Sequence, residues 1–410
     1  TFPGPMPLGP SMFTFLWTLH EATRDPAYAQ VLYIANGRKL DDLPRDPGHP
    51  DPAAFRKAVA SLIEREGATP DLRSVNKQEW HLAILRGGRN ENRRALWLNY
   101  DSGGNHAHMN GMNVGLFARG LDLIPDFGYP PVQFGGWDTP EAKWYYQTAA
   151  HHTVAVDGKN TAAMWGTPDS IKGGRTTLWG DGRQVRWIRV SGAPVYTDTQ
   201  LQQFERTLVM VDVSETDFYV VDIFRVVGGN DHAKFIHSHY GTIRVDGLAL
   251  QPDTDYGYKT LMRNFRTDPN PPVPWTAAWT IEDRCGYLPA GTPVGFRYTD
   301  LTHGASASTC EAWINACIFD ACKPDWLPRL MIRRRGGTSP LASTFVAILE
   351  PCGKEAVVSK CRRLDVQARG AACSDNVVGM EVVLADGRRD ILLAADVADP
   401  LHRSQPDTAN

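Results

Sequence analysis

The sequence predicts a mainly β protein in which a large antiparallel β-sandwich follows a short helical segment. Two observations support this prediction. Apolar residues recur every three or four positions over the first ~85 residues, which is typical of helices that pack on one face. From Arg93 onward they form many short runs separated by turn signals, which is typical of a sandwich. We therefore divide the chain into residues 1–88, the helical segment and its linker, and residues 89–410, the β-sandwich.

Capping residues predict three helices in the first segment. Ser11 precedes an apolar run and is the expected cap of the first helix. Asp25-Pro26 and Asp51-Pro52 each place a carboxylate cap before a proline at the first helical position. Gly37 and Gly67 follow the second and third helices, so we expect these helices to end there.

Short apolar runs predict the strands of the second segment. The predicted strands are residues 94–100, 152–156, 185–190, 206–213, 218–226, 345–349 and 377–384. Asp386-Gly387 separates two apolar triplets and predicts a hairpin turn. Residues 268–274 contain four prolines and predict a stiff loop rather than a strand.

Composition excludes several classes of protein. The 410 residues carry a net charge of -3, with 42% hydrophobic and 22% charged residues, as in ordinary globular proteins. We expect no nucleic-acid partner, because such proteins are usually more basic. No apolar run approaches the ~20 residues of a membrane span. The seven cysteines all lie after position 284, and none forms a Cys-x-x-Cys pair, so a cysteine zinc site is not expected.

Several histidines and one aspartate are candidate metal ligands, although an isolated His-x-His pair is common and does not by itself predict a metal site. His106 and His108 are two residues apart and would share one face of a strand. Asp126 follows an apolar segment, and His151 opens a predicted strand. Imidazole and carboxylate groups are ligands that zinc accepts readily, although such sets also bind iron or manganese.

Several ordered motifs resemble the heparinase II/III-like polysaccharide lyases, which include heparin, heparan sulfate, alginate and oligoalginate lyases. The motifs are residues 105–108, 116–120, 125–129 and 144–158, followed by 204–207, 221–225, 228–232 and 235–238. The resemblance is specific between about residues 95 and 240 and corresponds to the C-terminal portion of the family. It implies an incomplete α/α toroid followed by an antiparallel β-sandwich, with residues 1–88 as the end of the toroid.

The resemblance also implies roles for individual residues. The implied zinc ligands are His108, Asp126 and His151, and the ion would brace the sandwich beside the cleft. His106 matches the catalytic histidine, and Tyr145 lies where the family often has a tyrosine, on what we expect to be a strand. Asn105 and Trp144 are the candidate substrate-binding residues. The sequence departs from the family at Asn110, where an aspartate is common, and at His152, where an asparagine is usual.

The implied reaction is β-elimination on an anionic polysaccharide that contains uronic acid. A base removes the proton at C5, an acid protonates the leaving O4, and histidine suits either role because its pKa is near neutral. The toroid that supplies further active-site residues is expected in the full-length protein or in a separate chain. The family implies a periplasmic or secreted bacterial enzyme, and a homodimer is compatible with it.

Two other functions are open. The chain could be a non-catalytic carbohydrate-binding or structural sandwich. A two-histidine, one-carboxylate set is also found in non-haem iron oxygenases, but these predict a small barrel. For sugar contacts, the candidate platforms are Trp137, Trp144, Trp165, Trp179 and Trp187. The cluster Arg329, Arg333, Arg334 and Arg335 is expected to be a solvated charged face, with polysaccharide binding as the alternative.

Overall fold

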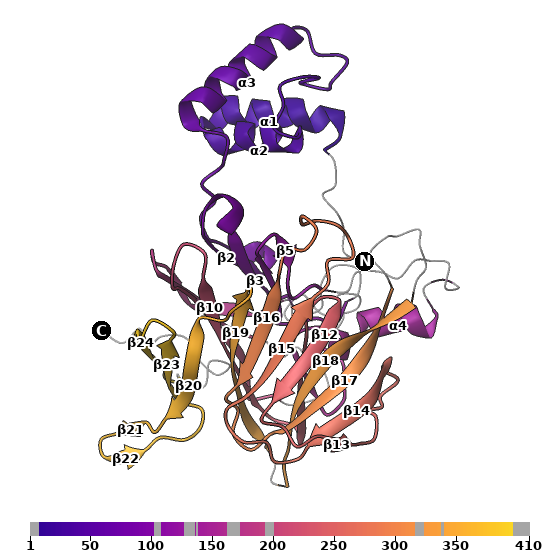
Figure 1. Ribbon diagram of the computed structural model, residues 1–410, viewed down its shortest axis with the longest axis vertical. Coiled ribbons are helices and arrows are strands. Elements are labelled where there is room, and N and C mark those ends of the chain that lie inside the picture. Colours follow the sequence, from indigo (N-terminus) through magenta and orange to yellow (C-terminus); the bar gives the residue numbers. More distant parts are fainter. Residues whose placement is uncertain are drawn as a thin grey trace, which may run out of the picture. The chain divides into compact units, whose positions relative to one another are not determined.

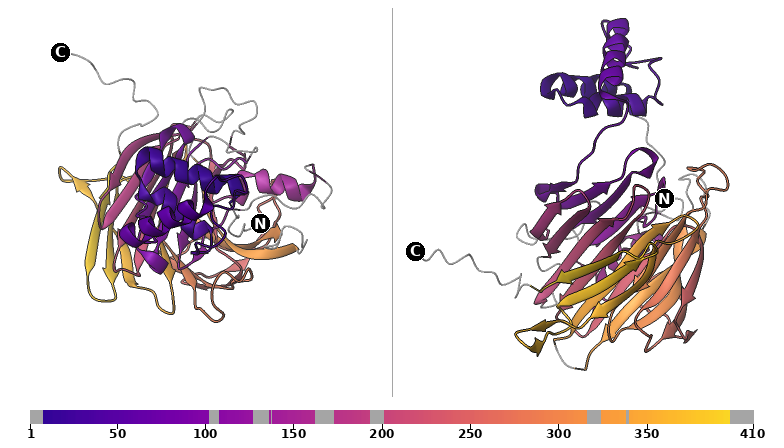
Figure 2. Two further views of the ribbon diagram at one scale, coloured as in Figure 1. Left: turned by 90° about the horizontal axis from the view of Figure 1, so that it is seen from above. Right: turned by 60° about the vertical axis from the view of Figure 1, so that its left-hand side comes forward.

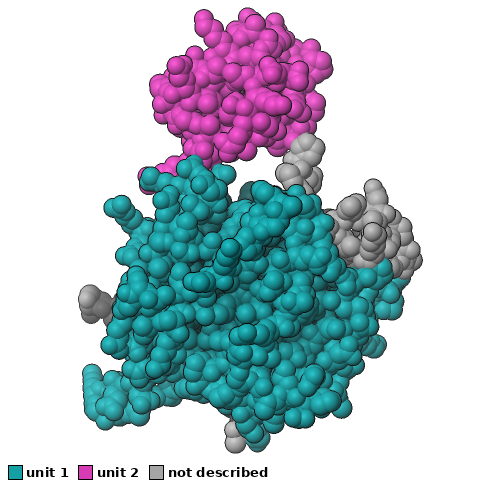
Figure 3. Space-filling model, viewed as in Figure 1, with its two compact units in different colours: residues 1–2, 74–410 teal, residues 3–73 magenta. Residues whose placement is uncertain are grey.

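The computed structural model describes residues 8–101, 108–126, 136, 138–161, 173–192, 201–315, 324–337 and 340–396. The chain divides into two compact units, a helical unit of Pro3–Arg73 and a β unit that comprises Ser74–Asn410 (Figure 3). The helical unit ends before the predicted boundary at residue 88, because strands that lie between residues 75 and 87 pair with the first sheet of the β unit.

The helical unit contains α1 (Pro10–Thr23), α2 (Pro26–Ala35) and α3 (Pro52–Glu66). Asp25 and Asp51 cap α2 and α3 as predicted, since their carboxylates accept hydrogen bonds from the first-turn amides of the helices. Helix α1 begins one residue before Ser11, with Gly9 at its N-cap. The three helices bury one small apolar core, which consists of Phe13, Leu32, Leu43, Phe55 and Val59.

Three antiparallel sheets form the body of the β unit (Figures 1 and 2). The five-stranded sheet is β1 (Val75–Lys77), β2 (Leu82–Gly87), β3 (Arg94–Asn99), β4 (Asn113–Ala118) and β5 (Leu121–Asp122). The eight-stranded sheet is, in spatial order, β12 (Gly241–Asp246), β15 (Trp275–Ile281), β16 (Gly295–Asp300), β19 (Ala342–Cys352), β10 (Phe218–Val227), β9 (Gln203–Asp212), β8 (Val185–Ser191) and β7 (Arg175–Asp181). The six-stranded sheet is β13 (Gln251–Pro252), β14 (Met262–Asp268), β17 (Ser306–Asn315), β18 (Pro324–Arg335), β11 (Asp231–His237) and β6 (Val154–Val156).

The remaining elements are smaller. The three-stranded sheet is β20 (Val358–Leu364), β23 (Val378–Leu384) and β24 (Arg389–Ala394), and β21 (Gln367–Ala368) pairs with β22 (Ala371–Ala372). The short helices of the β unit are α4 (Pro140–Tyr146), η1 (Gln78–Trp80), η2 (Asn90–Asn92) and η5 (Thr148–Ala150). The β23–β24 hairpin turns at Asp386-Gly387, which confirms that prediction.

Apolar side chains on facing sheets form the main core of the sandwich. The eight-stranded sheet contributes residues such as Phe224 and Phe345, the five-stranded sheet Leu96 and Leu116, and the six-stranded sheet Leu330. A second core lies on the other face of the eight-stranded sheet, where the three-stranded sheet covers it. The central strands β9, β10 and β19 of the eight-stranded sheet are therefore buried on both faces. The predicted mainly β fold with an antiparallel sandwich is confirmed.

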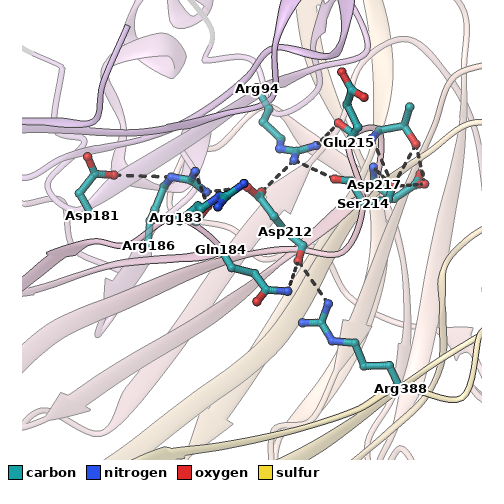
Figure 4. A network of polar contacts seen from close by, with 11 residues as sticks. Arg94, Asp181, Arg183, Gln184, Arg186, Asp212, Ser214, Glu215, Asp217 and Arg388 are labelled. Atoms are coloured by element: carbon teal, nitrogen blue, oxygen red, sulfur yellow. Dashed lines mark hydrogen bonds and ion pairs between the residues drawn. The ribbon is translucent and has the colours of Figure 1, made fainter. Parts of the chain in front are cut away.

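A network of charged groups ties three of these sheets together at one end of the sandwich (Figure 4). The Asp212 carboxylate at the end of β9 pairs with Arg94 of β3 at 2.9 Å and with Arg186 of β8 at 2.7 Å. Its backbone carbonyl accepts from Arg388, which lies between β23 and β24. Arg94 also donates to the carbonyl groups of Ser214 and Glu215 in the turn after β9. This turn is therefore the point where the first, second and fourth sheets meet.

A second ionic group lies inside the sandwich. The Asp222 carboxylate of β10 accepts two hydrogen bonds at 2.8 Å from Arg206 of β9, and its Oδ2 lies 2.8 Å from Nζ of Lys234 on β11. All three side chains are buried. Burial alone would raise the pKa of Asp222, but the two cations outweigh it and lower that pKa below its usual range. The ions thus join the eight-stranded sheet to the six-stranded sheet through their mutual pairing.

Within the described ranges, no helix is both long enough and apolar enough to cross a membrane. Of the cysteines, Cys285 is disulfide-bonded, and four described cysteines carry free thiols. The free thiols are those of Cys310, Cys352, Cys361 and Cys373.

Buried histidines predict that stability falls in mild acid. Burial lowers the pKa of His239 to about 4 and also lowers that of His232. Between pH 6.5 and about 4 the unfolded chain binds a proton at His239 while the folded chain does not. As the pH decreases through this range, the free energy of unfolding should therefore decrease by up to about 1.4 kcal/mol per pH unit from His239, and His232 contributes in the same direction. Urea unfolding from pH 7.5 to 4.5 measures this slope.

The test is a substitution that removes the titrating group. His239→Gln should reduce the slope by the contribution of about one proton. Equal slopes in wild type and in the His239 variant would contradict the prediction.

Candidate functional site

Three segments of the β unit converge at the predicted metal site. His108 lies five residues before β4, and Asp126 follows β5 by four residues. His151 follows η5 and precedes β6, so it comes from the six-stranded sheet, whereas the other two flank the five-stranded sheet. The site therefore lies where these two sheets meet, and the hydrophobic residues Leu123 and Ile124 anchor the Asp126 segment in the main core.

The side chains of these residues form one cluster, which we call the His/Asp cluster (His108, Asp126 and His151). Nδ1 of His151 lies 2.6 Å from Oδ1 of Asp126, and the two imidazole rings are 5.3 Å apart between centroids. Nδ2 of Asn113 donates to Oδ2 of Asp126 at 3.0 Å. Nε2 of His151 is buried and makes no hydrogen bond in the described part of the chain.

The cluster keeps its carboxylate ionised. Burial alone would raise the pKa of Asp126, but His151, His108 and His152 together outweigh it and lower that pKa to about 2. The hydrogen bond from Asn113 also orients this carboxylate. Two imidazoles and one ionised carboxylate are a donor set that zinc accepts. In the described residues, however, no group of three or more His, Cys, Asp or Glu side chains has donor atoms that converge on one point.

Two buried arginines hold the backbone that carries His151. Arg329 of β18 donates to the carbonyl groups of Ala149, Ala150 and His151 at 2.6–3.1 Å. Arg206 of β9 donates to the His152 carbonyl at 2.6 Å and also to that of Met112, just before β4. Four successive carbonyl groups, at residues 149–152, therefore accept from guanidinium groups of two different sheets. This arrangement leaves the segment little freedom to move.

Arg329 also determines the protonation of a neighbouring histidine. Its guanidinium can only donate, so Nδ1 of His237, at 2.7 Å, must accept. The proton of His237 then lies on Nε2, which donates to the Pro125 carbonyl at 3.0 Å. Nε2 of His152 lies at the same distance from that carbonyl. Burial lowers the pKa of both histidines, and that of His152 falls to about 3. Both imidazoles are therefore neutral where they contact Pro125, the residue that precedes Asp126.

Arg329 itself carries an unusual buried charge. Its side chain is fully buried, and no described carboxylate lies within ion-pair distance. Burial lowers its pKa to about 10, which still leaves the group charged at neutral pH. The expectation that Arg329 belongs to a solvated face is therefore wrong. Arg335, on the same strand, is exposed as expected, and Arg333 pairs with Asp231.

Of the other predicted site residues, two lie outside the described part of the chain and two are buried. His106 and Asn105 lie outside the described residues. Trp144 and Tyr145 are fully buried on α4, where Nε1 of Trp144 donates to the Trp313 carbonyl and the Tyr145 ring packs on the Trp313 ring. Neither buried side chain is exposed to a substrate. The expected strand at Tyr145 is a helix, because Thr139 caps it and Pro140 occupies its first turn.

The sequence analysis missed a tyrosine at the cluster. Tyr146, the last residue of α4, is half-buried, and its ring meets the His108 ring edge-on with 5.4 Å between centroids. Burial and the charge of Asp138 raise the pKa of Tyr146. The helical turn is the reason for the difference, since it directs Tyr145 into the core and its neighbour toward His108. Of the predicted tryptophan platforms, Trp137 and Trp165 lie outside the described residues, while Trp179 and Trp187 are half-buried.

Comparison with known proteins identifies the class of fold. Residues 94–257 match the family model described as heparinase II/III-like, C-terminal. This match confirms the resemblance inferred from the motifs, and the matched range contains the whole His/Asp cluster.

Solved structures agree with this class. A structure named heparinase III is 16% identical with a TM-score of 0.58, and the alignment covers 91% of this chain and 47% of that one. A heparan sulfate lyase from Pedobacter heparinus is 15% identical with a TM-score of 0.56, covering 93% of this chain and 49% of that one. These likenesses show the fold, and the chain spans about half the length of these structures. Among curated proteins, none matches the sequence at comparable significance.

The buried guanidinium group of Arg329 leads to a prediction about the free energy of unfolding. Arg329→Met should lower the free energy of unfolding by at least about 2 kcal/mol, because three carbonyl groups and His237 lose their donor. Arg335→Met on the same strand is the control and should change stability by no more than about 0.5 kcal/mol. Urea unfolding at pH 7.5 measures both values. Equal effects of the two substitutions would show that Arg329 does not hold the 149–152 segment.

Proposed function

We propose that this chain is part of a polysaccharide lyase that cleaves uronic acid-containing polysaccharides by β-elimination. The observation that supports this most is the match of residues 94–257 to the heparinase II/III-like family, together with a rigidly held His/Asp cluster inside that range. The substrate class is a glycosaminoglycan or an alginate type of polymer. The solved relatives, named as heparinase III and heparan sulfate lyase, support an acidic polysaccharide.

The proposed reaction breaks the C5–H and C4–O4 bonds and forms a C4–C5 double bond and a new O–H bond on the leaving group. A base takes the proton from C5, the electron pair forms the double bond between C4 and C5, and the C4–O4 bond breaks. An acid then protonates the leaving oxygen, so no water or oxidant is consumed. The uronate carboxylate must be neutralised, because negative charge develops next to it in the transition state.

We assign the base or the neutralising group to His106, and Asn105 to substrate binding. His106 precedes His108 by two residues in the sequence. Tyr145 and Trp144, assigned to catalysis and substrate binding from the resemblance, are buried, and Tyr146 is better placed for contact near His108. A further acid or base and the carboxylate-neutralising groups would come from an α/α toroid, in the full-length protein or in a separate chain. The half-length coverage of the relatives supports this.

We further propose that His108, Asp126 and His151 hold a zinc ion with a structural role. The donor set suits zinc, and the buried Nε2 of His151 has no hydrogen bond in the described residues. When bound, the ion would brace the segments that carry His106 and His151. Elimination needs no activated water, so the chemistry does not require the metal to act on the substrate.

Compartment and assembly are also proposals. A periplasmic or secreted location fits the disulfide at Cys285, because disulfides persist in oxidising compartments. A homodimer is compatible with the family. A non-catalytic carbohydrate-binding sandwich is the second candidate function, and the low identity to the solved relatives keeps it open.

Activity can be tested by ultraviolet absorbance. Incubation with alginate, heparan sulfate, chondroitin sulfate or ulvan should produce the absorbance of an unsaturated uronate with at least one polymer. His106→Ala should reduce the rate at least about 100-fold, because a proton-transfer group is lost. Its zinc content should stay unchanged. No product from any of these polymers, with a protein that also carries the toroid, would contradict the lyase assignment.

Metal binding can be tested by elemental analysis. Wild type should contain about one zinc per chain, and His108→Ala and His151→Ala should each lose most of it, because three protein ligands are needed for tight binding. His303→Ala is the matched control, since this exposed histidine also pairs with an aspartate, Asp375. Equal zinc in wild type and in the His108 variant would refute the assigned ligands.

A further inference from the structure

A tryptophan lies flat against the backbone of the neighbouring strand on the five-stranded sheet. Trp97 of β3 is directly opposite Gly115 of β4, and a Cβ atom at Gly115 would lie only 2.1 Å from the indole ring. Glycine is therefore required for this close approach. Trp97 is half-buried and takes no part in the main core, to which its neighbours Leu96 and Leu98 belong.

The pairing of the strands defines what surrounds this ring. Leu96 and Leu98 point to the core, so Trp97 and its cross-strand partners lie on the opposite, outward face of the sheet. We call this surface the Trp97 face. It consists of three rows of residues that are paired across neighbouring strands. The first row is Lys77, Leu82, Asn99 and Asn113, the second is Val75, Ile84, Trp97 and Gly115, and the third is Arg86, Ala95, Phe117 and Asp122. The strands β2, β3 and β5 of this sheet lie at one end of the β unit (Figure 1).

The Trp97 face is continuous with the His/Asp cluster. Asn113 ends the first row, and its amide donates to Asp126 at 3.0 Å. Gly115 lies two residues further along β4, so the tryptophan row is roughly 7 Å from the row that contains Asn113. Phe117, in the third row, is 36% exposed. Trp97 and Phe117 thus form an aromatic strip that leads away from the cluster. The strip is about as long as two or three sugar rings.

The polar groups of this face suit an acidic sugar. Lys77 is exposed in the first row, and Arg86 is half-buried in the third. Asn99, which is half-buried, adds an amide group, whereas the Asn113 amide is buried and bonded to Asp126 and to the His152 backbone. Asp122 is the one carboxylate in the three rows, and its Oδ1 is buried. An anionic ligand on this face therefore meets two cations.

We propose that the Trp97 face binds the uronate-containing polysaccharide, with a pyranose ring stacked on Trp97 next to the sugar at the His/Asp cluster. Sugar rings have an apolar face of C–H groups that covers an indole ring, while their hydroxyl and carboxylate groups reach the flanking amides and cations. This inference rests on the proposed function for the class of sugar and extends it by assigning a binding surface.

The chain supplies an internal control for this proposal. Trp187 of β8 lies on Gly180 of β7 in the same way, since a Cβ atom there would be 2.2 Å from the indole ring. Its other cross-strand partner, Val209, packs against the core beneath the three-stranded sheet. Trp187 is therefore on the far face of the eight-stranded sheet and is not continuous with the cluster.

The test measures binding by calorimetry, in a His106→Ala background so that the probe is not cleaved. The probes are an alginate tetrasaccharide, a heparan sulfate tetrasaccharide and neutral cellotetraose. Trp97→Ala should weaken binding of at least one uronate probe roughly tenfold, the loss expected for one stacked ring. Gly115→Ala keeps the tryptophan but displaces it, and it should weaken binding as well. Trp97→Phe, which keeps a smaller ring, should be intermediate.

The controls are Trp187→Ala and Gly180→Ala, which should bind the same probe as the parent does. Thermal melting checks that each variant is folded. Unchanged affinity in folded Trp97→Ala, equal binding of cellotetraose and the uronate probes, or no binding of either uronate probe by the parent would each overturn the proposal. Weakened binding in the Trp97 variant, without cleavage of any polymer by a protein that also carries the toroid and has His106 intact, would support the binding surface and reject the lyase assignment.

Discussion

The backbone of residues 149–152 depends on two buried guanidinium groups that reach it from opposite sheets. Arg206 comes from the eight-stranded sheet and Arg329 from the six-stranded sheet, and together they bind four successive carbonyl groups. Burying a guanidinium costs free energy unless its donors are satisfied. Arg206 is compensated by Asp222, whereas Arg329 relies on carbonyl groups and His237. The free-energy cost of burying Arg329 therefore falls at the segment that carries His151.

This constraint explains the geometry of the His/Asp cluster. Arg329 sets the tautomer of His237, which binds the Pro125 carbonyl, and the next residue is Asp126. Arg206 reaches the carbonyl group of Met112, one residue before Asn113, whose side chain holds the same aspartate. Arg206 and Arg329 therefore fix both the segment that carries His151 and the segment that carries Asp126. The backbone that carries His151 is therefore held before a ligand binds.

Much of the fold could be predicted from local signals. Asp25 and Asp51 with their following prolines indicated two helices, and Asp386-Gly387 indicated a hairpin, because caps and turns depend on nearby residues. The gathering of His108, Asp126 and His151 followed from the family resemblance. The burial of Arg329 could not be predicted, because a run of arginines on a strand looks solvated until the partner carbonyls are placed. Helix α4 was missed because aromatic residues at 144–146 favour a strand, and only tertiary packing separates Tyr145 from Tyr146.

The central claim is that these buried cations shape a site where His108, Asp126 and His151 hold a metal ion within a lyase-like sandwich. The most direct measurement is anomalous diffraction at the zinc absorption edge, from crystals of the protein grown with zinc. The account predicts one strong peak between the two imidazoles and the Asp126 carboxylate, with the 149–152 carbonyls still bound to Arg206 and Arg329. No peak at this position, or a peak only at surface groups such as His303 and Asp375, would contradict it.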